Sequence, residues 1–197
     1  ERGQREANSI WLWGQGRAPR MESYRERFGL EGAVISAVDL LKGIARAAGL
    51  EAPRVAGATG YLDTDYEAKV AAALEALGRA DFAYLHVEAP DEAGHSGNVA
   101  HKVQAIEDFD RRVVAPMRAG LEALGEPFAL LALPDHPTPI PLRTHTAEPV
   151  PFVLYRSDGA GAVPGEAFTE ACARATGVVV TEAHRLMEHV LGRARLW

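Results

Sequence analysis

The chain has 197 residues, of which 47% are hydrophobic and 24% are charged, and its formal net charge is −6. A domain of this size can bury roughly 70% of its unfolded surface, so it needs no disulfide, and the single cysteine, Cys172, could not form one within the chain. A small disulfide-bonded secreted scaffold is therefore excluded. The acidic balance also argues against a nucleic-acid partner, because counterion release requires a clustered basic face.

Membrane and secretion signals are also missing. No stretch approaches the roughly 20 apolar residues that a membrane span requires, and the N-terminal residues lack the apolar core of a signal peptide. We therefore predict a cytoplasmic protein without a membrane partner. The chain begins with Glu1 rather than Met, so we expect it to be processed or excised from a longer polypeptide.

Short apolar runs alternate with helical patterns along the first half of the chain. Ser9–Trp13 has the pattern of a buried strand that stops at a glycine-rich loop. Ala33–Ile35 predicts a second strand, followed by a helix over Leu40–Ala48 that ends at Gly49. An apolar stripe at helical spacing predicts a further helix that extends to Leu77.

Asp63 or Thr64 is the expected N-cap of that further helix. The remaining elements follow the same alternation. We predict strands over residues 82–88, 128–133 and 150–155, a long helix over 99–124, two helices around 166–174 and 182–191, and a surface turn over 159–165. Val103, Ile106, Val113 and Met117 are expected on the inner face of the long helix. This order favours one α/β domain over residues 1–197, with a mostly parallel sheet that carries helices on both faces.

Polar residues gather where the predicted strands end. Strand 82–88 leads to Asp91 and His95, strand 128–133 leads to Asp135 and His136, and the loop before strand 150–155 carries Arg143 and His145. Ligands of open α/β sheets bind outside the carboxyl ends of the strands. We therefore expect these three segments to meet at one rim of the sheet.

The residue types at this rim are those of a metal site. Asp91 and His95 are four apart, so if the chain turns helically there they share one face and can bind one ion, and His145 could complete the set. A carboxylate with two imidazoles suits Mn²⁺, Zn²⁺ or Co²⁺ better than Ca²⁺. Asp135 and His136 exceed what one tetrahedral site needs, which suggests two metal ions.

Each of these residues also has a simpler interpretation. Asp91 after a proline could cap a helix, and Asp135-His136 between prolines could form a turn in which the carboxylate accepts backbone hydrogen bonds. His145 alone could be a surface histidine. Their joint position at predicted strand ends is what favours the metal site.

Several segments resemble a known family. Residues 90–95 (Pro-Asp-Glu-Ala-Gly-His), 134–139 (Pro-Asp-His-Pro-Thr-Pro) and 144–152 (Thr-His-Thr-Ala-Glu-Pro-Val-Pro-Phe) are similar to cofactor-independent phosphoglycerate mutase of the archaeal type. Residues 7–19 and 57–64 resemble the same family. The family belongs to the alkaline phosphatase superfamily, and the similarity extends over almost the whole chain.

The resemblance implies roles for the rim residues. Asp91, His95 and His145 match the ligands of one metal ion, and Asp135 and His136 match part of a second site. Family members also have a first strand that ends in an aspartate ligand, followed by a nucleophilic serine and an inserted domain, and nothing in this chain matches them. The chain thus resembles the C-terminal part of an alkaline-phosphatase-like core that lacks its N-terminal strand.

Three further residues carry groups suited to the chemistry. Lys42 is similar in position to a lysine that the family uses near the transferred phosphate, although a solvated helix lysine is an equal alternative. Arg17, behind two glycines, could bind a phosphate by paired hydrogen bonds or could be a surface arginine. Ser96 adjoins His95 but is rejected as a nucleophile, because it should point away from the metal.

The function implied by the resemblance is interconversion of 3-phosphoglycerate and 2-phosphoglycerate through a phosphoserine intermediate. The expected cofactors are two divalent ions among Mn²⁺, Zn²⁺, Co²⁺ and Mg²⁺, and we expect the chain alone to be almost inactive. Two alternatives stay open: another phosphoryl-transfer enzyme of the superfamily, such as a phosphatase or a homoserine-kinase-like enzyme, or a non-catalytic metal-binding domain. The missing strand makes a homo-oligomer or a separate N-terminal half a plausible partner.

Overall fold

The computed structural model describes residues 8–12, 14–159 and 167–194. Its helices and strands, in chain order, are α1 (Tyr24–Phe28), β1 (Gly32–Ile35), α2 (Asp39–Ala47), α3 (Tyr66–Leu77), β2 (Phe82–Leu85), α4 (Ala89–Ser96), α5 (Val99–Phe109), the π-helical η1 (Asp110–Val114), α6 (Ala115–Leu124), β3 (Ala129–Ala132), β4 (Val153–Arg156), α7 (Glu170–Ala175), the 3₁₀-helical η2 (Ala183–Arg185) and α8 (Leu186–Val190). Among these elements, no helix is long and apolar enough to cross a membrane.

The strands form two pairs. β1 pairs in parallel with β2, with Gly32 opposite Phe82, whereas β3 pairs antiparallel with β4, with Ala129 opposite Arg156. Within the described residues no ladder joins the two pairs, so β2 and β3 each keep one edge without a strand partner. The predicted α/β class is confirmed, but the sheet is less parallel than expected. No helix lies between β3 and β4 among the described elements, and parallel strands are usually joined through one.

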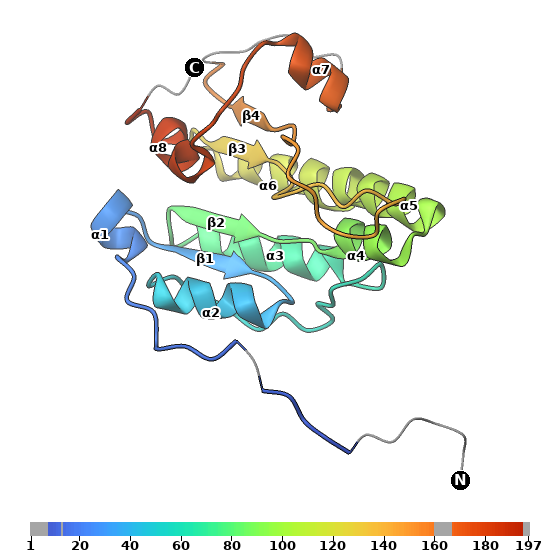
Figure 1. Ribbon diagram of the computed structural model, residues 1–197. Helices are drawn as coiled ribbons and strands as arrows, with labels where there is room; N and C mark the ends of the chain where they lie inside the picture. The colour runs from blue at the N-terminus through green and yellow to red at the C-terminus, as the bar shows by residue number, and fades with distance from the viewer. Residues whose placement is uncertain (1–7, 13, 160–166, 195–197) are drawn as a thin grey trace.

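Helices cover both faces of the β1–β2 pair (Figure 1). Val34 on β1 packs with Ala45 of α2 and with Leu50 in one buried cluster. Ile35, next along the strand, belongs to the other cluster, whose remaining members come mainly from α3, η1 and α6. Successive side chains of a strand point to opposite faces, which is why this four-residue strand is buried throughout.

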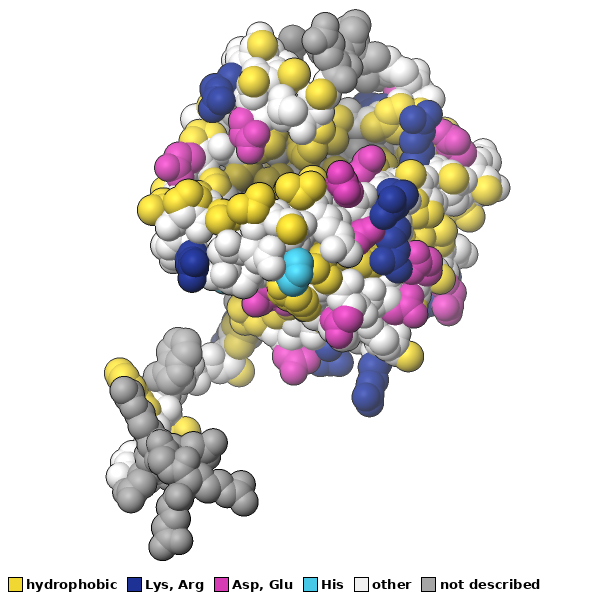
Figure 2. Space-filling model, turned by 90° about the vertical axis from the view of Figure 1, so that its right-hand side faces the viewer, with side chains coloured by type: hydrophobic (Ala, Val, Ile, Leu, Met, Phe, Trp, Pro, Cys, Tyr) yellow, Lys and Arg dark blue, Asp and Glu magenta, His cyan; other side chains and the backbone are white. Residues whose placement is uncertain are grey.

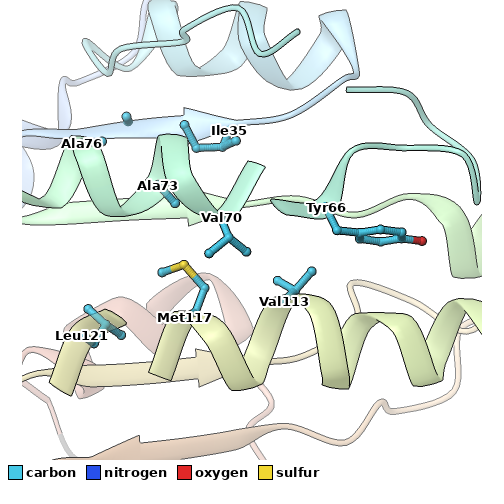
Figure 3. Close-up of a cluster of buried hydrophobic side chains, with 9 residues drawn as sticks. Ile35, Tyr66, Val70, Ala73, Ala76, Val113, Met117 and Leu121 are labelled. Carbon is cyan, nitrogen blue, oxygen red and sulfur yellow. The ribbon is translucent and has the colours of Figure 1, made fainter. Parts of the chain in front are cut away.

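The larger cluster fills the space between α3 and the helix that contains η1 and α6. Figure 3 shows Val70 of α3 facing Val113 and Met117 across this interface. Two guanidinium nitrogens of Arg112 each donate a hydrogen bond of 2.8 Å to the Glu67 carboxylate of α3. The η1 segment is thereby fixed against α3.

The long helix has the predicted bounds, Val99 to Leu124, but its buried face differs from the prediction. Val113 and Met117 are buried as expected, whereas Val103 and Ile106 are 51% and 53% exposed. The five-residue π-helical segment η1 lies between the two halves. A π turn takes more residues than an α turn, so an apolar stripe at α-helical spacing cannot keep one orientation on both sides of it.

Other predicted elements also need correction. Residues 9–12 of the predicted first strand are irregular, and Ile10, Trp11 and Leu12 are 82–89% exposed, while Trp13 lies outside the described residues. Isolated strands leave their backbone groups unpaired, and this segment runs away from the body of the molecule (Figure 1). Residues 160–165 of the predicted turn also lie outside the described residues.

The boundaries of two elements near the rim also differ. Strand β2 ends at Leu85, three residues earlier than predicted, and helix α4 follows it, which supplies the helical turn that the Asp91–His95 spacing requires. The N-cap of α3 is Asp65, whose side chain accepts a hydrogen bond from the Ala68 amide, rather than Asp63 or Thr64.

Candidate metal centre

Helix α4 presents the first two candidate ligands. Pro90 lies in its first turn, where a missing amide hydrogen costs nothing, and Gly97 ends the helix with a left-handed φ of 72°. Asp91 and His95 are one turn apart on this helix, and Oδ2 of Asp91 lies 3.3 Å from Nε2 of His95. The four-residue spacing on one helix therefore brings these two side chains together.

The third ligand comes from the segment after β3. Nε2 of His145 lies 3.0 Å from Nε2 of His95 and 3.3 Å from Oδ1 of Asp91. Backbone hydrogen bonds fold this segment back on itself, because the Thr146 amide donates to Pro137 and the Arg143 amide donates to Pro139. Residues about 50 positions apart are thereby brought into contact.

The spacing of these three side chains is close to that around a bound cation. A tetrahedral zinc ion with bonds of about 2.0–2.1 Å holds its ligand atoms about 3.3 Å apart. The two imidazole Nε2 atoms are 3.0 Å apart, and each lies 3.3 Å from a different oxygen of Asp91; each side chain is partly accessible, with 27–51% of its surface exposed. A carboxylate and two imidazoles at these distances are the donor set of a divalent-ion site.

His136 lies beside this trio. Its ring centroid is 3.7 Å from that of His145, and one ligand atom each of Asp91, His136 and His145 lie within 4.8 Å of one another. Asp135 Oδ2 is 3.3 Å from His136 Nε2, and the Asp135 side chain is 74% exposed. All five predicted ligands therefore lie close together at one rim, with His136 directly beside the trio.

Sequence reasoning missed Thr138, which links these ligands. Its hydroxyl, on a residue that is 5% exposed, donates a hydrogen bond to Asp91 Oδ1 and lies 3.4 Å from Nδ1 of His136. A threonine two residues after a candidate ligand is a weak signal. Only its contact with α4 reveals its place in the site.

A second polar pair lies at the carboxyl ends of β1 and β2. Ser36, which is buried, accepts a hydrogen bond from the Val38 amide, and its Oγ is 3.2 Å from Nδ1 of His86. Burial lowers the pKa of His86, although the nearby Asp135 and Asp91 raise it. Sequence reasoning missed this pair, although the serine and the histidine each directly follow one of two neighbouring strands.

Two charged residues whose pKa values are shifted by burial, Lys69 and Glu88, lie between the Ser36–His86 pair and α4 in the chain or contact its residues. The Lys69 ammonium donates hydrogen bonds to the carbonyl oxygens of Thr59 (3.1 Å) and His86 (3.5 Å), and burial lowers its pKa. Burial, together with Glu92 and Asp91, raises the pKa of Glu88, which directly precedes α4. The end of β2 is thus held in place by an interior lysine.

The other two predicted site residues have no hydrogen bond or ion pair to this centre among those found in the described part of the chain. Nζ of Lys42 donates to the Ala37 carbonyl and to Asp39 on its own helix, both at 3.1 Å, so it remains at the end of β1. Arg17 is exposed and belongs to the irregular segment before α1, which runs away from the body of the molecule (Figure 1).

The face toward which β1, β2 and β3 point is shown in Figure 2. Hydrophobic side chains gather in and around a hollow in the upper half of this face, and charged side chains of both signs lie beside it. No single-sign charged patch dominates the face, so any anionic ligand would have to be recognised by individual groups.

The chain is similar to known proteins of one superfamily. A model of the metalloenzyme superfamily matches residues 6–191. A probable 2,3-bisphosphoglycerate-independent phosphoglycerate mutase of Geobacter sulfurreducens is 58% identical over 98% of this chain and 48% of its own length. The corresponding enzyme of Methanosarcina mazei is 56% identical over 86% of this chain and 43% of its own length.

A solved structure agrees with these sequence matches. A protein from Pyrococcus horikoshii superposes with a TM-score of 0.77 at 27% identity, covering 92% of this chain and 55% of that protein. The chain spans about half the length of the curated relatives it matches. These relatives are named as phosphoglycerate mutases, which confirms the resemblance found in the motifs, and the family model covers nearly every residue. The chain therefore belongs to the metalloenzyme superfamily.

Proposed function

We propose that this chain forms the metal-binding part of a 2,3-bisphosphoglycerate-independent phosphoglycerate mutase, an isomerase that interconverts 3-phosphoglycerate and 2-phosphoglycerate in glycolysis and gluconeogenesis. The observation that carries the proposal is the spacing of 3.0–3.3 Å among the ligand atoms of Asp91, His95 and His145. The names of relatives at 56% and 58% identity supply the substrate class.

The proposed role of each group follows from its position. Asp91, His95 and His145 hold one divalent ion, and Asp135 with His136 contributes to a second. Mn²⁺, Zn²⁺, Co²⁺ and Mg²⁺ remain the candidates, because selection among them depends on geometry and supply. Bound ions would spread the negative charge of a phosphoryl group and favour ionisation of an attacking hydroxyl.

The other groups at the rim would act on the substrate or on the ligands. Thr138 orients Asp91 through its hydrogen bond. We propose that the Lys42 ammonium, at the end of β1, meets an anionic oxygen of the substrate, and that Arg17 does so only when its segment folds toward the rim. The free edges of β2 and β3 support the further proposal that a strand from another segment or a second copy completes the sheet.

A chimeric enzyme tests the proposal. The half of the Geobacter relative that this chain does not match is fused to this chain, and mutase and phosphate-release rates are measured with Mn²⁺. We expect mutase activity in the chimera, little activity in the chain alone, and loss of activity in a chimera with Asp91→Asn. Phosphate release without isomerisation would instead identify a phosphatase, and an inactive, well-folded chimera that binds Mn²⁺ would favour a non-catalytic domain.

A further inference from the structure

The backbone of Arg143 is unusual. Its φ is 53°, and it is the one residue other than glycine with a positive φ among the residues that the structure describes. The left-handed region is unfavourable for an L-residue, with glycine best suited to it and asparagine next. The conformation therefore needs a compensating contact.

That contact is with a proposed ligand. Nδ1 of His95 lies 3.0 Å from the carbonyl oxygen of Arg143. A carbonyl oxygen can only accept a hydrogen bond, so Nδ1 must carry the proton and donate it. In the neutral imidazole this leaves the lone pair on Nε2, the atom that faces Asp91 and His145.

The side chain of Arg143 reaches the same helix. Its guanidinium lies against Gly97, where an added Cβ would come within 2.5–2.8 Å of three guanidinium atoms. Arg143 thus contacts α4 twice, through its carbonyl at His95 and through its side chain at the end of the helix. The two contacts can be separated by substitution, because only the first depends on the left-handed backbone.

We propose that Arg143 is a positioning residue whose left-handed backbone aims its carbonyl at His95 and so fixes the imidazole tautomer that can bind a metal ion. The inference rests on the proposed metal centre for its purpose, but the tautomer itself is a property of the metal-free chain. Groups that orient a ligating histidine in this way typically change metal affinity by 10–100-fold when they are lost.

Arg143→Asn and Arg143→Val form the matched pair for the test. Both remove the guanidinium, but asparagine tolerates the left-handed region and valine does not. The ¹⁵N chemical shifts of the His95 ring in the metal-free chain, assigned with His95→Gln, report the tautomer at a pH where the ring is neutral. Titration with Mn²⁺ then reports the affinity, and thermal unfolding of the metal-free variants separates loss of folding from loss of binding.

We expect the Nδ1-protonated tautomer in the wild-type chain and in Arg143→Asn, a mixture of tautomers in Arg143→Val, and at least about tenfold weaker Mn²⁺ binding in Arg143→Val than in Arg143→Asn. The inference is overturned if wild-type His95 is protonated on Nε2, or if both variants match the wild type. It is also overturned if Arg143→Lys keeps affinity while asparagine and valine lose it equally, because the charge would then be responsible. If the tautomers are as expected but the wild-type chain does not bind Mn²⁺, the inference about Arg143 is supported and the proposed metal centre is refuted.

Discussion

Gly94 of α4 lies directly against Thr138, so that a Cβ on Gly94 would come 2.5 Å from the Thr138 carbonyl oxygen and 2.9 Å from its Cγ2. This close approach lets the segment after β3 bring His136 and His145 to the helix that carries Asp91 and His95. The glycine between the two α4 ligands is thus explained by backbone packing, independently of metal chemistry.

Gly94→Ala should therefore damage both stability and the site. Overpacking of this kind typically costs about 1–3 kcal/mol, and the displaced segment should weaken Mn²⁺ binding. Urea unfolding and Mn²⁺ titration measure the two effects. Gly43→Ala is the matched control: nothing lies within 4 Å of its added Cβ, so it should stabilise α2 by about 0.5–1 kcal/mol. Equal stability of the two variants would contradict the packing argument.

Loss of the Thr138 hydroxyl should weaken metal binding without unfolding the chain. The hydroxyl donates to Asp91 Oδ1, so Thr138→Val frees that carboxylate to rotate away from the two histidines. We expect a 10–100-fold rise in the Mn²⁺ dissociation constant, measured by calorimetry, with recovery in Thr138→Ser. Unchanged affinity in the valine variant would show that Asp91 is oriented by other contacts.

The ion pair between α3 and η1 should make stability depend on acid pH. Hydrogen bonds from Arg112 lower the pKa of Glu67 to about 2 from 4.5. The folded state therefore binds fewer protons than the unfolded state, and the stabilisation is present above pH 4.5 and lost as the pH falls toward 2. The Glu67 side chain is 64% exposed, so the effect is small and weakened by salt.

The measurement is the free energy of unfolding of the wild type and of Glu67→Gln as a function of pH. The wild type should be the more stable of the two at neutral pH, and the difference should shrink at low pH, where the Glu67 carboxyl becomes as neutral as the amide that replaces it. A difference that stays constant from neutral to acid pH would mean that the charge of Glu67 contributes nothing.

Much of this arrangement could be predicted from the sequence. Four-residue spacing places Asp91 and His95 on one helical face, and the convergence of parallel strand ends placed Asp135 and His136 at the same rim. Thr138, Gly94 and the carbonyl of Arg143 were missed because each acts through a contact with a residue more than 40 positions away. The exposed Val103 and Ile106 were assigned to the core because the π segment that changes the register has no recognisable pattern.

The first predicted strand failed for a related reason. A strand pattern describes side chains, whereas a strand also needs a neighbour for its backbone, and Ile10 and Leu12 are exposed without one. Replacing both with aspartate should therefore leave the free energy of unfolding unchanged, since neither side chain is buried. Ile35→Ala, at a fully buried position of β1, should cost about 2–5 kcal/mol in the same urea experiment. Destabilisation by the aspartate pair would place the segment in the folded core.

Equilibrium titration of the chain with Mn²⁺, followed by the electron paramagnetic resonance signal of the free ion, tests the convergence of Asp91, His95 and His145 most directly. The account predicts that the wild-type chain removes Mn²⁺ from solution, and that His95→Gln and His145→Gln each weaken binding strongly while their metal-free forms stay folded. Binding that is unchanged in both histidine variants would contradict it.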